Sequence, residues 1–293
     1  MSKLYPVGVQ NFEKVILGGY EYVDKTALIY ELFNTGSYYF LSRPRRFGKS
    51  LLLSTLEAYA QGKKELFKGL ALEKLEKDWT VYPVLHLDLN TQKYDSPESL
   101  TNVLEENVRN WEALYGASSA EIGVARRFQG IIRRACEQTG RRVVILIDEY
   151  DKPMLQAIGN EALQNEYRST LKAFYGALKS MDGCIRFALL TGVTKFGKVS
   201  VFSDLNNLRD ISMDDRYVEI CGISEKEVHA YFEEDIHALA TATGLAYEET
   251  CAELKANYDG YHFTENAVGM YNPFSLLNTF AKKKFGSYWF ETG

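Results

Sequence analysis

The segment at residues 43–50, Arg-Pro-Arg-Arg-Phe-Gly-Lys-Ser, constrains the fold more than any other part of the chain. It follows an apolar run at residues 38–41 and precedes three leucines at residues 51–53, which is the order strand, loop, helix. A loop that ends Gly-Lys-Ser in this context can wrap backbone NH groups around a phosphate chain, set Lys49 against the terminal phosphates and offer Ser50 to Mg²⁺. The helix N-terminus adds a partial positive charge. The segment therefore predicts a phosphate-binding loop.

The match to the general phosphate-loop pattern is partial, because that pattern begins with glycine and this chain has Arg43. An ordinary basic turn is the alternative for the loop taken alone. We expect Lys49 to face solvent, where it would contribute a point charge to the phosphates and little to the core.

A second constraint stands about a hundred residues later, where five apolar residues at 143–147 run directly into Asp148 and Glu149. This pattern is typical of a buried parallel strand that delivers acids to its carboxyl edge. Beside a phosphate loop, Asp148 would hold the Mg²⁺ shell and Glu149 would polarise the attacking water. Without the loop, the alternative is a strand that ends in a charged turn. Together the two segments predict Mg-nucleotide hydrolysis.

The segment at residues 192–199, Gly-Val-Thr-Lys-Phe-Gly-Lys-Val, has the glycines and the lysine of a second phosphate loop. Val199 replaces the metal-binding hydroxyl, and residues 200–207 favour turns and strands over the helix that such a loop needs. We therefore assign the apolar run at 187–190 to a strand beside the acidic strand. Thr191 at its end would present a hydroxyl to the γ-phosphate or to the attacking water, and a bond to local backbone is the alternative.

Alternation of apolar runs with helical patterns predicts an α/β fold, a P-loop NTPase sandwich with a mainly parallel sheet, followed by a small C-terminal helical lid. Residues 1–215 form the expected core with an N-terminal lead-in. Residues 216–293 hold an expected last core strand at 217–220 and the lid. Three lid helices are predicted, at residues 224–243, at residues 248–258 and from residue 272 onward.

The lead-in contains an expected helix that Asp24 caps and Gly36 ends. In many P-loop ATPases a lead-in of this kind lies across the adenine. Phe12, Val15 and Ile16 are therefore candidates for a base pocket, and plain core packing is the alternative.

Six segments together resemble the AAA-ATPase-like proteins of bacteria, and the similarity covers nearly the whole chain. These segments are residues 22–26 (Tyr-Val-Asp-Lys-Thr), 42–50, 147–151 (Ile-Asp-Glu-Tyr-Asp), 190–193, 206–208 (Asn-Asn-Leu) and 271–274 (Tyr-Asn-Pro-Phe). The resemblance implies that the loop without a first glycine is the family's own version. It also implies ATP and Mg²⁺ as ligands, with Lys49 and Ser50 on the phosphates and the metal, Asp148 on the metal and Glu149 as base. The residues expected to bind the nucleotide are Arg45, Arg46, Phe47, Gly48, Lys49, Ser50 and Leu51.

Members of this family often continue into a PD-(D/E)XK nuclease-like domain, and this chain stops at Gly293 before such a domain would fit. We therefore expect a shortened form of a longer protein, with the nuclease-like domain as an effector in longer relatives. A naturally short relative is the alternative.

The predicted activity is that of an ATPase which serves as an energy or switch module for an effector domain. The alternative is a nucleotide-gated switch or scaffold that binds ATP with little hydrolysis. A kinase is disfavoured, because a glutamate directly after the metal-binding aspartate suits activation of water. Arg209 is a candidate arginine finger, acting within the chain or across a subunit contact in an oligomer, and a surface ion pair is an equal alternative.

Composition limits the other partners. The formal net charge of −5 over 293 residues argues against a protein that coats nucleic acid through its overall field, although a local basic site remains open. The candidate for such a site is a predicted helix at residues 119–139, with a solvated face balanced by acids as the alternative. Its stacked arginines are Arg126, Arg127, Arg133 and Arg134.

Two further patterns concern the compartment. The four cysteines have no metal-type spacing and the N-terminus has no apolar signal region, which together indicate reduced thiols in a cytoplasm. No uninterrupted apolar run approaches the roughly 20 residues of a membrane span.

Overall fold

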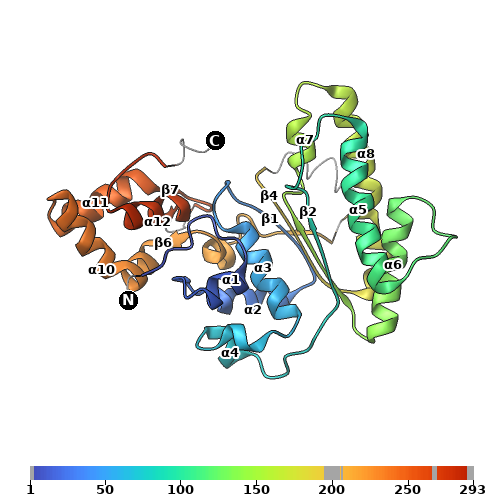
Figure 1. Ribbon diagram of the computed structural model, residues 1–293, viewed down its shortest axis with the longest axis horizontal. Coiled ribbons are helices and arrows are strands. Elements are labelled where there is room, and N and C mark those ends of the chain that lie inside the picture. Colours follow the sequence, from blue (N-terminus) through green and yellow to red (C-terminus); the bar gives the residue numbers. More distant parts are fainter. Residues whose placement is uncertain (1–2, 195–204, 206, 266–268, 289–293) are drawn as a thin grey trace.

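The computed structural model describes residues 3–194, 205, 207–265 and 269–288 (Figure 1). Its centre is a five-stranded sheet with the spatial order β2-β3-β4-β1-β5, and each pairing in it is parallel. The strands are β1 (Tyr38–Ser42), β2 (Val84–Asp88), β3 (Val143–Asp148), β4 (Ile185–Gly192) and β5 (Arg209–Asp210). The prediction of an α/β fold with a mainly parallel sheet is confirmed, and β4 lies beside the acidic strand β3 as expected.

Helices cover both faces of this sheet (Figure 1). One layer consists of α1 (Phe12–Leu17), α2 (Thr26–Thr35), α3 (Lys49–Ala60), η1 (Lys64–Phe67) and α4 (Ala71–Leu75). The other consists of α5 (Pro97–Tyr115), α6 (Val124–Thr139), α7 (Lys152–Gln156), α8 (Glu161–Ser180) and the short turn η2 (Asp182–Cys184). Alternate residues of β3 enter different cores: Val144 and Leu146 pack with the α3 layer, and Ile145 packs with the α8 layer. This is the period of two expected for a strand buried on both faces.

Local sequence signals set several helix ends. Asn160 caps α8 by accepting a hydrogen bond from the backbone N of Leu163 at 3.1 Å. Ser96 forms a capping box at the start of α5, with Pro97 in the first turn. α2 begins at Thr26 with Lys25 at the N-cap, so the expected cap at Asp24 is wrong by one residue, although Oδ1 of Asp24 accepts from the backbone N of Thr26 at 2.8 Å.

Helix α6 begins at Val124, five residues later than the predicted start. The preceding loop folds back so that the Glu121 carboxylate pairs with Arg134 at 2.7 Å. This carboxylate approaches α6 at Gly130, where a Cβ atom would lie 1.9 Å from a Glu121 oxygen. Glycine at that position therefore allows the loop to pack against the helix.

The C-terminal part forms a separate helical lobe, which we call the lid (Figure 1). Its elements are β6 (Ile223–Ser224), α10 (Glu225–Thr243), α11 (Tyr247–Tyr258), β7 (Asp259–Tyr261), β8 (Met270–Tyr271) and α12 (Pro273–Lys282). The three expected helices are present, and Ser224 forms the predicted capping box on α10. The small antiparallel sheet of order β6-β8-β7 was not predicted, because its strands contain only two or three residues each.

The predicted last strand at residues 217–220 is wrong. These residues belong to the 3₁₀ helix η3 (Asp215–Ile220), and the sheet edge is β5 instead. Aromatic and β-branched residues at these positions resemble a strand in composition, but Tyr217 and Ile220 pack into the α3-layer core and Asp214 caps the turn through the backbone N of Arg216. Among the described residues, no helix is both long enough and apolar enough to cross a membrane.

Candidate functional site

The loop between β1 and α3 curls around the ammonium group of Lys49. The Nζ of Lys49 donates to the carbonyl oxygens of Arg43 at 3.1 Å and Pro44 at 3.2 Å. Left-handed backbone at Arg46 (φ 63°) and at Gly48 (φ 95°) allows this tight curl. The side chain of Lys49 is only 3 % exposed, so the expectation of a solvent-facing lysine is wrong.

The acidic strand delivers Glu149 to the same lysine. Nζ of Lys49 lies 3.1 Å from Oε1 of Glu149, although the two residues are a hundred positions apart in the sequence. Glu149 has left-handed backbone (φ 52°), a conformation that a non-glycine residue adopts at some cost and that is common at functional sites. Burial raises the pKa of the Glu149 carboxyl, with a contribution from Asp148, against the opposing charge of Lys49.

Asp148 is held by β4. Its Oδ1 accepts from the hydroxyl of Thr191 at 2.6 Å and from the backbone N of Glu149 at 3.0 Å. Thr191 is fully buried, and its hydroxyl is used on Asp148 rather than on local backbone. The structure thus brings Thr191 to the acidic pair, but as the donor that orients Asp148.

The remaining loop residues differ in what they present. Arg45 and Arg46 are exposed, and the guanidinium of Arg46 lies 3.9 Å from the ring centroid of Phe274 in the lid. The ring of Phe47 is buried, which leaves only its backbone for a nucleotide. Ser50 is the second residue of α3 and is partly exposed. The NH groups of this first turn have no partner within the helix and can bind an anion.

Arg43, where the general pattern has glycine, points away from the loop into the protein. Its guanidinium donates to the carbonyl oxygens of Ser42 at 3.0 Å, Ser212 at 2.8 Å and Tyr217 at 3.3 Å. It also lies 3.9 Å from the ring centroid of Phe263. Burial lowers the pKa of Arg43 to about 10, which still leaves the group charged at neutral pH. The sequence offered no signal for this role beyond the departure from glycine.

Comparison with known proteins agrees with this geometry. A family model described as "Predicted AAA-ATPase" matches residues 6–202. The chain belongs to this AAA-ATPase-like family. It is also 42 % identical over 293 residues to an "Uncharacterized protein in vnfD 5'region" of Azotobacter chroococcum mcd 1, a match that covers 99 % of this chain and 54 % of the relative. The chain therefore spans about half the length of this curated relative.

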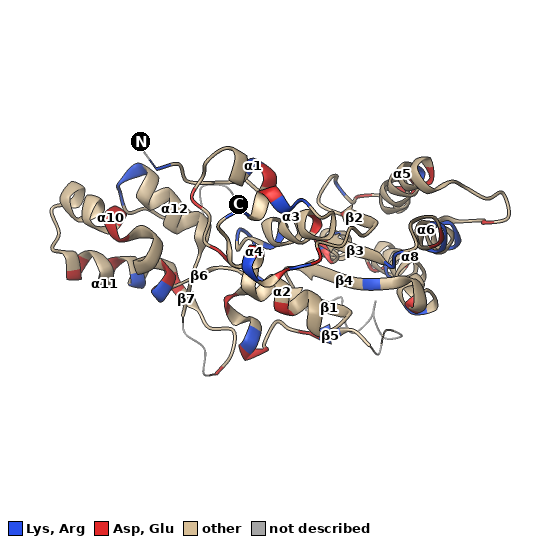
Figure 2. Ribbon diagram, turned by 90° about the horizontal axis from the view of Figure 1, so that it is seen from below, with Lys and Arg blue, Asp and Glu red and all other residues tan. Residues whose placement is uncertain are grey.

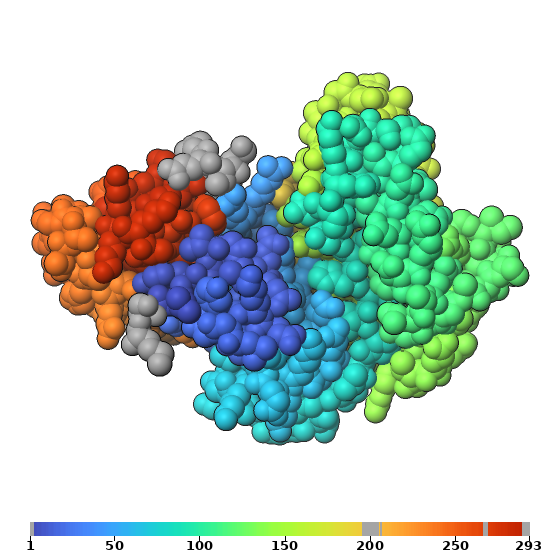
Figure 3. All heavy atoms as spheres, viewed as in Figure 1, coloured from blue at the N-terminus to red at the C-terminus, as the bar shows by residue number. Residues whose placement is uncertain are grey.

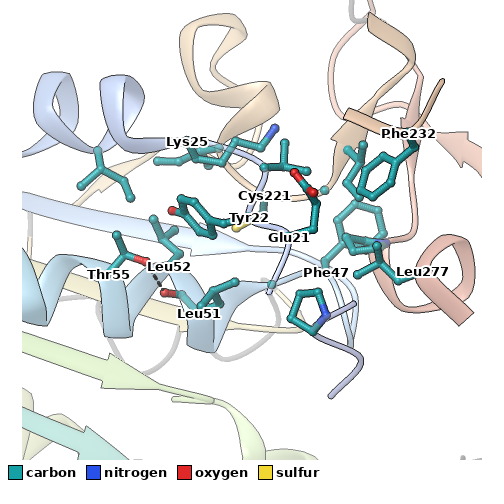
Figure 4. Close-up of a pocket in the computed structure, with 18 residues that line it drawn as sticks. Glu21, Tyr22, Lys25, Phe47, Leu51, Leu52, Thr55, Cys221, Phe232 and Leu277 are labelled. Atoms are coloured by element: carbon teal, nitrogen blue, oxygen red, sulfur yellow. Dashed lines mark hydrogen bonds between the residues drawn. The ribbon is translucent and has the colours of Figure 1, made fainter. Parts of the chain in front are cut away.

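A mostly apolar pocket adjoins the loop of this AAA-ATPase-like chain (Figure 4). Its walls come from residues 21–23 and 25 of the lead-in, from Gly48 and the first turns of α3, and from the lid through Phe232 and Leu277. The few polar side chains in it belong to Glu21, Tyr22, Lys25 and Thr55, with Thr55 donating to the carbonyl of Leu51 at 2.8 Å.

The candidates Phe12, Val15 and Ile16 do not line this pocket. Phe12 is fully buried and packs against Tyr22 and Phe67, with ring centroids 5.2 and 5.0 Å away. Core packing, the alternative stated above, is therefore what the geometry shows.

Arg209 lies apart from the loop. It pairs with Tyr39 of β1 in the sheet register, rather than with Ser42 where β1 enters the loop. Its guanidinium lies 2.6 Å from Asp214. The geometry shows the surface ion pair and does not support a finger within the chain, while a role across a subunit contact stays a prediction. Of the second loop-like segment, Lys198 and Val199 lie outside the described residues.

Helix α6 carries basic residues, which are blue in Figure 2, and three of its four arginines pair with acids. Arg127 contacts Glu112 of α5 at 2.7 Å and Glu105 at 2.5 Å. Arg133 and Arg134 share Glu121 at 3.1 and 2.7 Å. These ion pairs agree with a helix face balanced by acids.

Proposed function

We propose that this protein binds and hydrolyses Mg-ATP and serves as an energy or switch module for an effector domain. The main support is the 3.1 Å contact between Lys49 and Glu149, which brings the phosphate loop and the acidic strand into one site. Lys49 is nearly buried, so its charge requires a partner at all times. Bound phosphates would replace the carboxylate as that partner, and Glu149 would then be free to act on water.

The phosphates would be held by the first turn of α3, Lys49 and the exposed Arg45 and Arg46. Glu149 would accept a proton from the attacking water while the oxygen of that water forms a bond to the γ-phosphorus. The bond from that phosphorus to the β–γ bridging oxygen would break, giving ADP and inorganic phosphate. A carboxyl with a raised pKa is a stronger base than an ordinary glutamate, which supports this role.

Mg²⁺ would be held by the Ser50 hydroxyl and the Asp148 carboxylate. The two hydrogen bonds to Asp148 among the described residues both use Oδ1, which would leave Oδ2 for the metal shell. Within the described part of the chain, no three His, Cys, Asp or Glu side chains form a metal cluster. This donor set fits Mg²⁺, which usually binds through one or two protein oxygens together with nucleotide phosphates and water. When bound, the ion neutralises charge on the phosphates.

ATP is the proposed nucleotide, and the apolar pocket beside Gly48 and Leu51 is the proposed base site. The family implies ATP, and the sequence contains no Asn-Lys-x-Asp guanine-reading motif.

We place the protein in a cytoplasm, because its four cysteines are free thiols. The effector would be supplied by the additional length found in relatives, with a nuclease-like domain as the leading candidate.

The second candidate function is a nucleotide-gated switch with little hydrolysis. It is favoured by the contacts between loop and lid, such as Arg46 with Phe274 and Phe47 with Tyr261 at 4.7 Å between ring centroids. Such contacts would let the lid respond to the nucleotide.

Calorimetry and a steady-state ATPase assay with and without Mg²⁺ test the proposal. We expect Lys49→Ala to abolish ATP binding, and Lys198→Ala in the second loop-like segment to leave it nearly unchanged. Glu149→Gln should lower turnover by roughly 100-fold or more while ATP affinity holds, because it removes the charge that polarises water. Equal ATP affinity for Lys49→Ala and the parent would refute the loop assignment. Binding without turnover in the parent would favour the switch.

A further inference from the structure

Three residues of the phosphate loop contact aromatic rings of the lid. Arg43 lies 3.9 Å from the Phe263 centroid, and Phe47 packs edge-on against Phe263 at 5.5 Å. Arg46 lies 3.9 Å from the Phe274 centroid. The backbone N of Gly222 also donates to the carbonyl of Phe47 at 3.1 Å. A displacement of the loop therefore changes contacts in the lid.

The contact of Arg46 differs from the other two in its exposure. Arg43 and Phe47 are buried and structural, whereas Arg46 is exposed and Phe274 is only partly buried. The left-handed backbone of Arg46 (φ 63°) is unusual for a residue with a side chain, and such local strain is typical of functional positions.

Phe274 is held in a defined place at the start of α12. The side chain of Asn272 caps this helix by accepting from the backbone N of Ser275 at 3.0 Å, and the backbone N of Asn272 donates to the carbonyl of Tyr258 at 3.0 Å. Pro273, which lies between Asn272 and Phe274 in the sequence, lines the pocket beside the loop. Phe274 thus presents a ring from the lid at the edge of the proposed ATP site.

We infer that Phe274 is a positioning residue for Arg46, and that this pair couples the terminal phosphate of ATP to the lid. A guanidinium can stack one face on a ring while its edge donates two hydrogen bonds to a phosphate. The ring therefore preorganises the arginine without competing for its donors. The inference rests on the proposed function and adds the connection by which the lid distinguishes ATP from ADP.

The test compares ATP and ADP affinities, measured by calorimetry with Mg²⁺. Phe274→Leu keeps apolar bulk and removes the ring, so ATP affinity should fall by roughly two- to fivefold with ADP affinity unchanged, as expected for loss of an exposed cation–π contact. Phe274→Tyr keeps the ring and should restore ATP affinity. Phe285→Leu is the matched control, since Phe285 stacks on Tyr258 within the lid, 6.4 Å between centroids.

A double-mutant cycle identifies Arg46 as the partner. In an Arg46→Ala background, Phe274→Leu should have no further effect on ATP affinity. The inference would be overturned if Phe274→Leu weakened the ATP and ADP affinities equally, or if it weakened neither. It would also be overturned if Phe274→Leu lowered ATP affinity by the same factor in the Arg46→Ala background. If Phe274→Leu does not fold, Arg46→Lys decides: it keeps the charge without the planar face, so undiminished discrimination between ATP and ADP would overturn the inference. A parent that binds neither nucleotide would instead refute the proposed function.

Discussion

The buried ammonium group of Lys49 could exchange one ionic partner for another. Its ammonium group has the Glu149 carboxylate and two backbone carbonyls as partners, at 3.1 to 3.2 Å. An unpaired charge at this depth would be strongly destabilising, so the site must always supply a partner. In the proposed reaction, exchange of the carboxylate for phosphate would keep the lysine paired and would release the glutamate. The same contact thus joins the loop to the acidic strand and would prepare the proposed reaction.

Thr191 is the residue whose role is most directly testable. Thr191→Val keeps the side-chain shape but removes the 2.6 Å hydrogen bond to Asp148, so the carboxylate would no longer be oriented. We expect the Mg²⁺ concentration for half-maximal ATPase activity to rise roughly tenfold or more, with ATP binding in EDTA unchanged. Thr194→Val is the matched control, because its hydroxyl bonds Asp151 at 2.8 Å outside the proposed metal site. An unchanged Mg²⁺ requirement would show that Asp148 is held adequately without Thr191.

At the scale of elements, β2 and α3 are joined by His86 and Glu57, whose Nδ1 and Oε2 atoms lie 2.8 Å apart. Burial alone would lower the pKa of His86, but the hydrogen bond and charge of Glu57, with Asp148 and Asp88 nearby, raise it above its ordinary value. The hydrogen bond from His86 lowers the pKa of Glu57, against the effect of burial. Both groups are therefore charged together at mildly acidic pH.

The sign of the resulting pH dependence follows from these directions. The raised pKa of His86 gives stability that is complete below about pH 6.5 and is lost as pH rises through the folded-state value. The lowered pKa of Glu57 gives stability that is lost only as pH falls below its ordinary range near 4.3. Glu57→Gln should therefore cost about 1 kcal/mol of unfolding free energy near pH 5.5 and less at pH 8.5, as measured by urea denaturation. An equal cost at both pH values would contradict the ion pair.

Helices α5 and α6 are joined by Arg127. Arg127→Ala should lower the free energy of unfolding by about 1 kcal/mol, because it removes contacts to both Glu105 and Glu112. Arg126→Ala on the exposed side of the same helix should change it little. Denaturation curves compare the two variants.

If the four arginines bound nucleic acid instead, their replacement by alanine would reduce DNA affinity. The replacement would also flatten the salt dependence of that affinity by roughly one unit of log-log slope for each arginine.

At the scale of the whole molecule, the N-terminal segment joins the core to the lid (Figure 3). Lys3 contacts Asp235 of α10 at 2.8 Å, and Tyr5 donates a hydrogen bond to the same carboxylate. Lys25 contacts Glu227 at 2.5 Å, and both side chains are largely buried. The proposed base pocket lies between this segment and the lid, so a lid that opens would have to break these contacts.

Glu227→Gln tests the importance of this connection. The amide can still accept from the backbone N of Ser224 and so keep the helix cap, but the charge opposite Lys25 is lost. We expect release of a fluorescent ADP analogue to accelerate several-fold in stopped-flow measurements, since a largely buried ion pair no longer closes the lid. The control is Glu225→Gln, which removes an exposed pair with Lys255 at 2.8 Å. Equal release rates for both variants would argue against a lid held by this pair.

Local patterns in the sequence were sufficient for most of the fold. Apolar runs that end in candidate site residues predicted β1, β3 and β4, and Ser224 marked the start of α10. The failures are short elements: β5 has two residues and η3 has strand-like composition. Neither a two-residue edge strand nor a 3₁₀ turn has enough length to show a period, so only packing against β1 and Arg43 determines them.

The sequence by itself determined which residue types would meet phosphate, metal and water in the proposed site, because their chemistry and their position after strands are local properties. Tertiary structure alone decided how they are paired. Lys49 is buried against Glu149, and Thr191 donates a hydrogen bond to Asp148. Arg43 ties the loop to the backbone of Ser212, and Arg46 stacks on the ring of Phe274 in the lid. Each of these contacts joins segments whose proximity depends on the order of strands in the sheet and on the return of the lid to the loop. Spacing along one chain contains no record of such distances, which arise only when the separate layers pack.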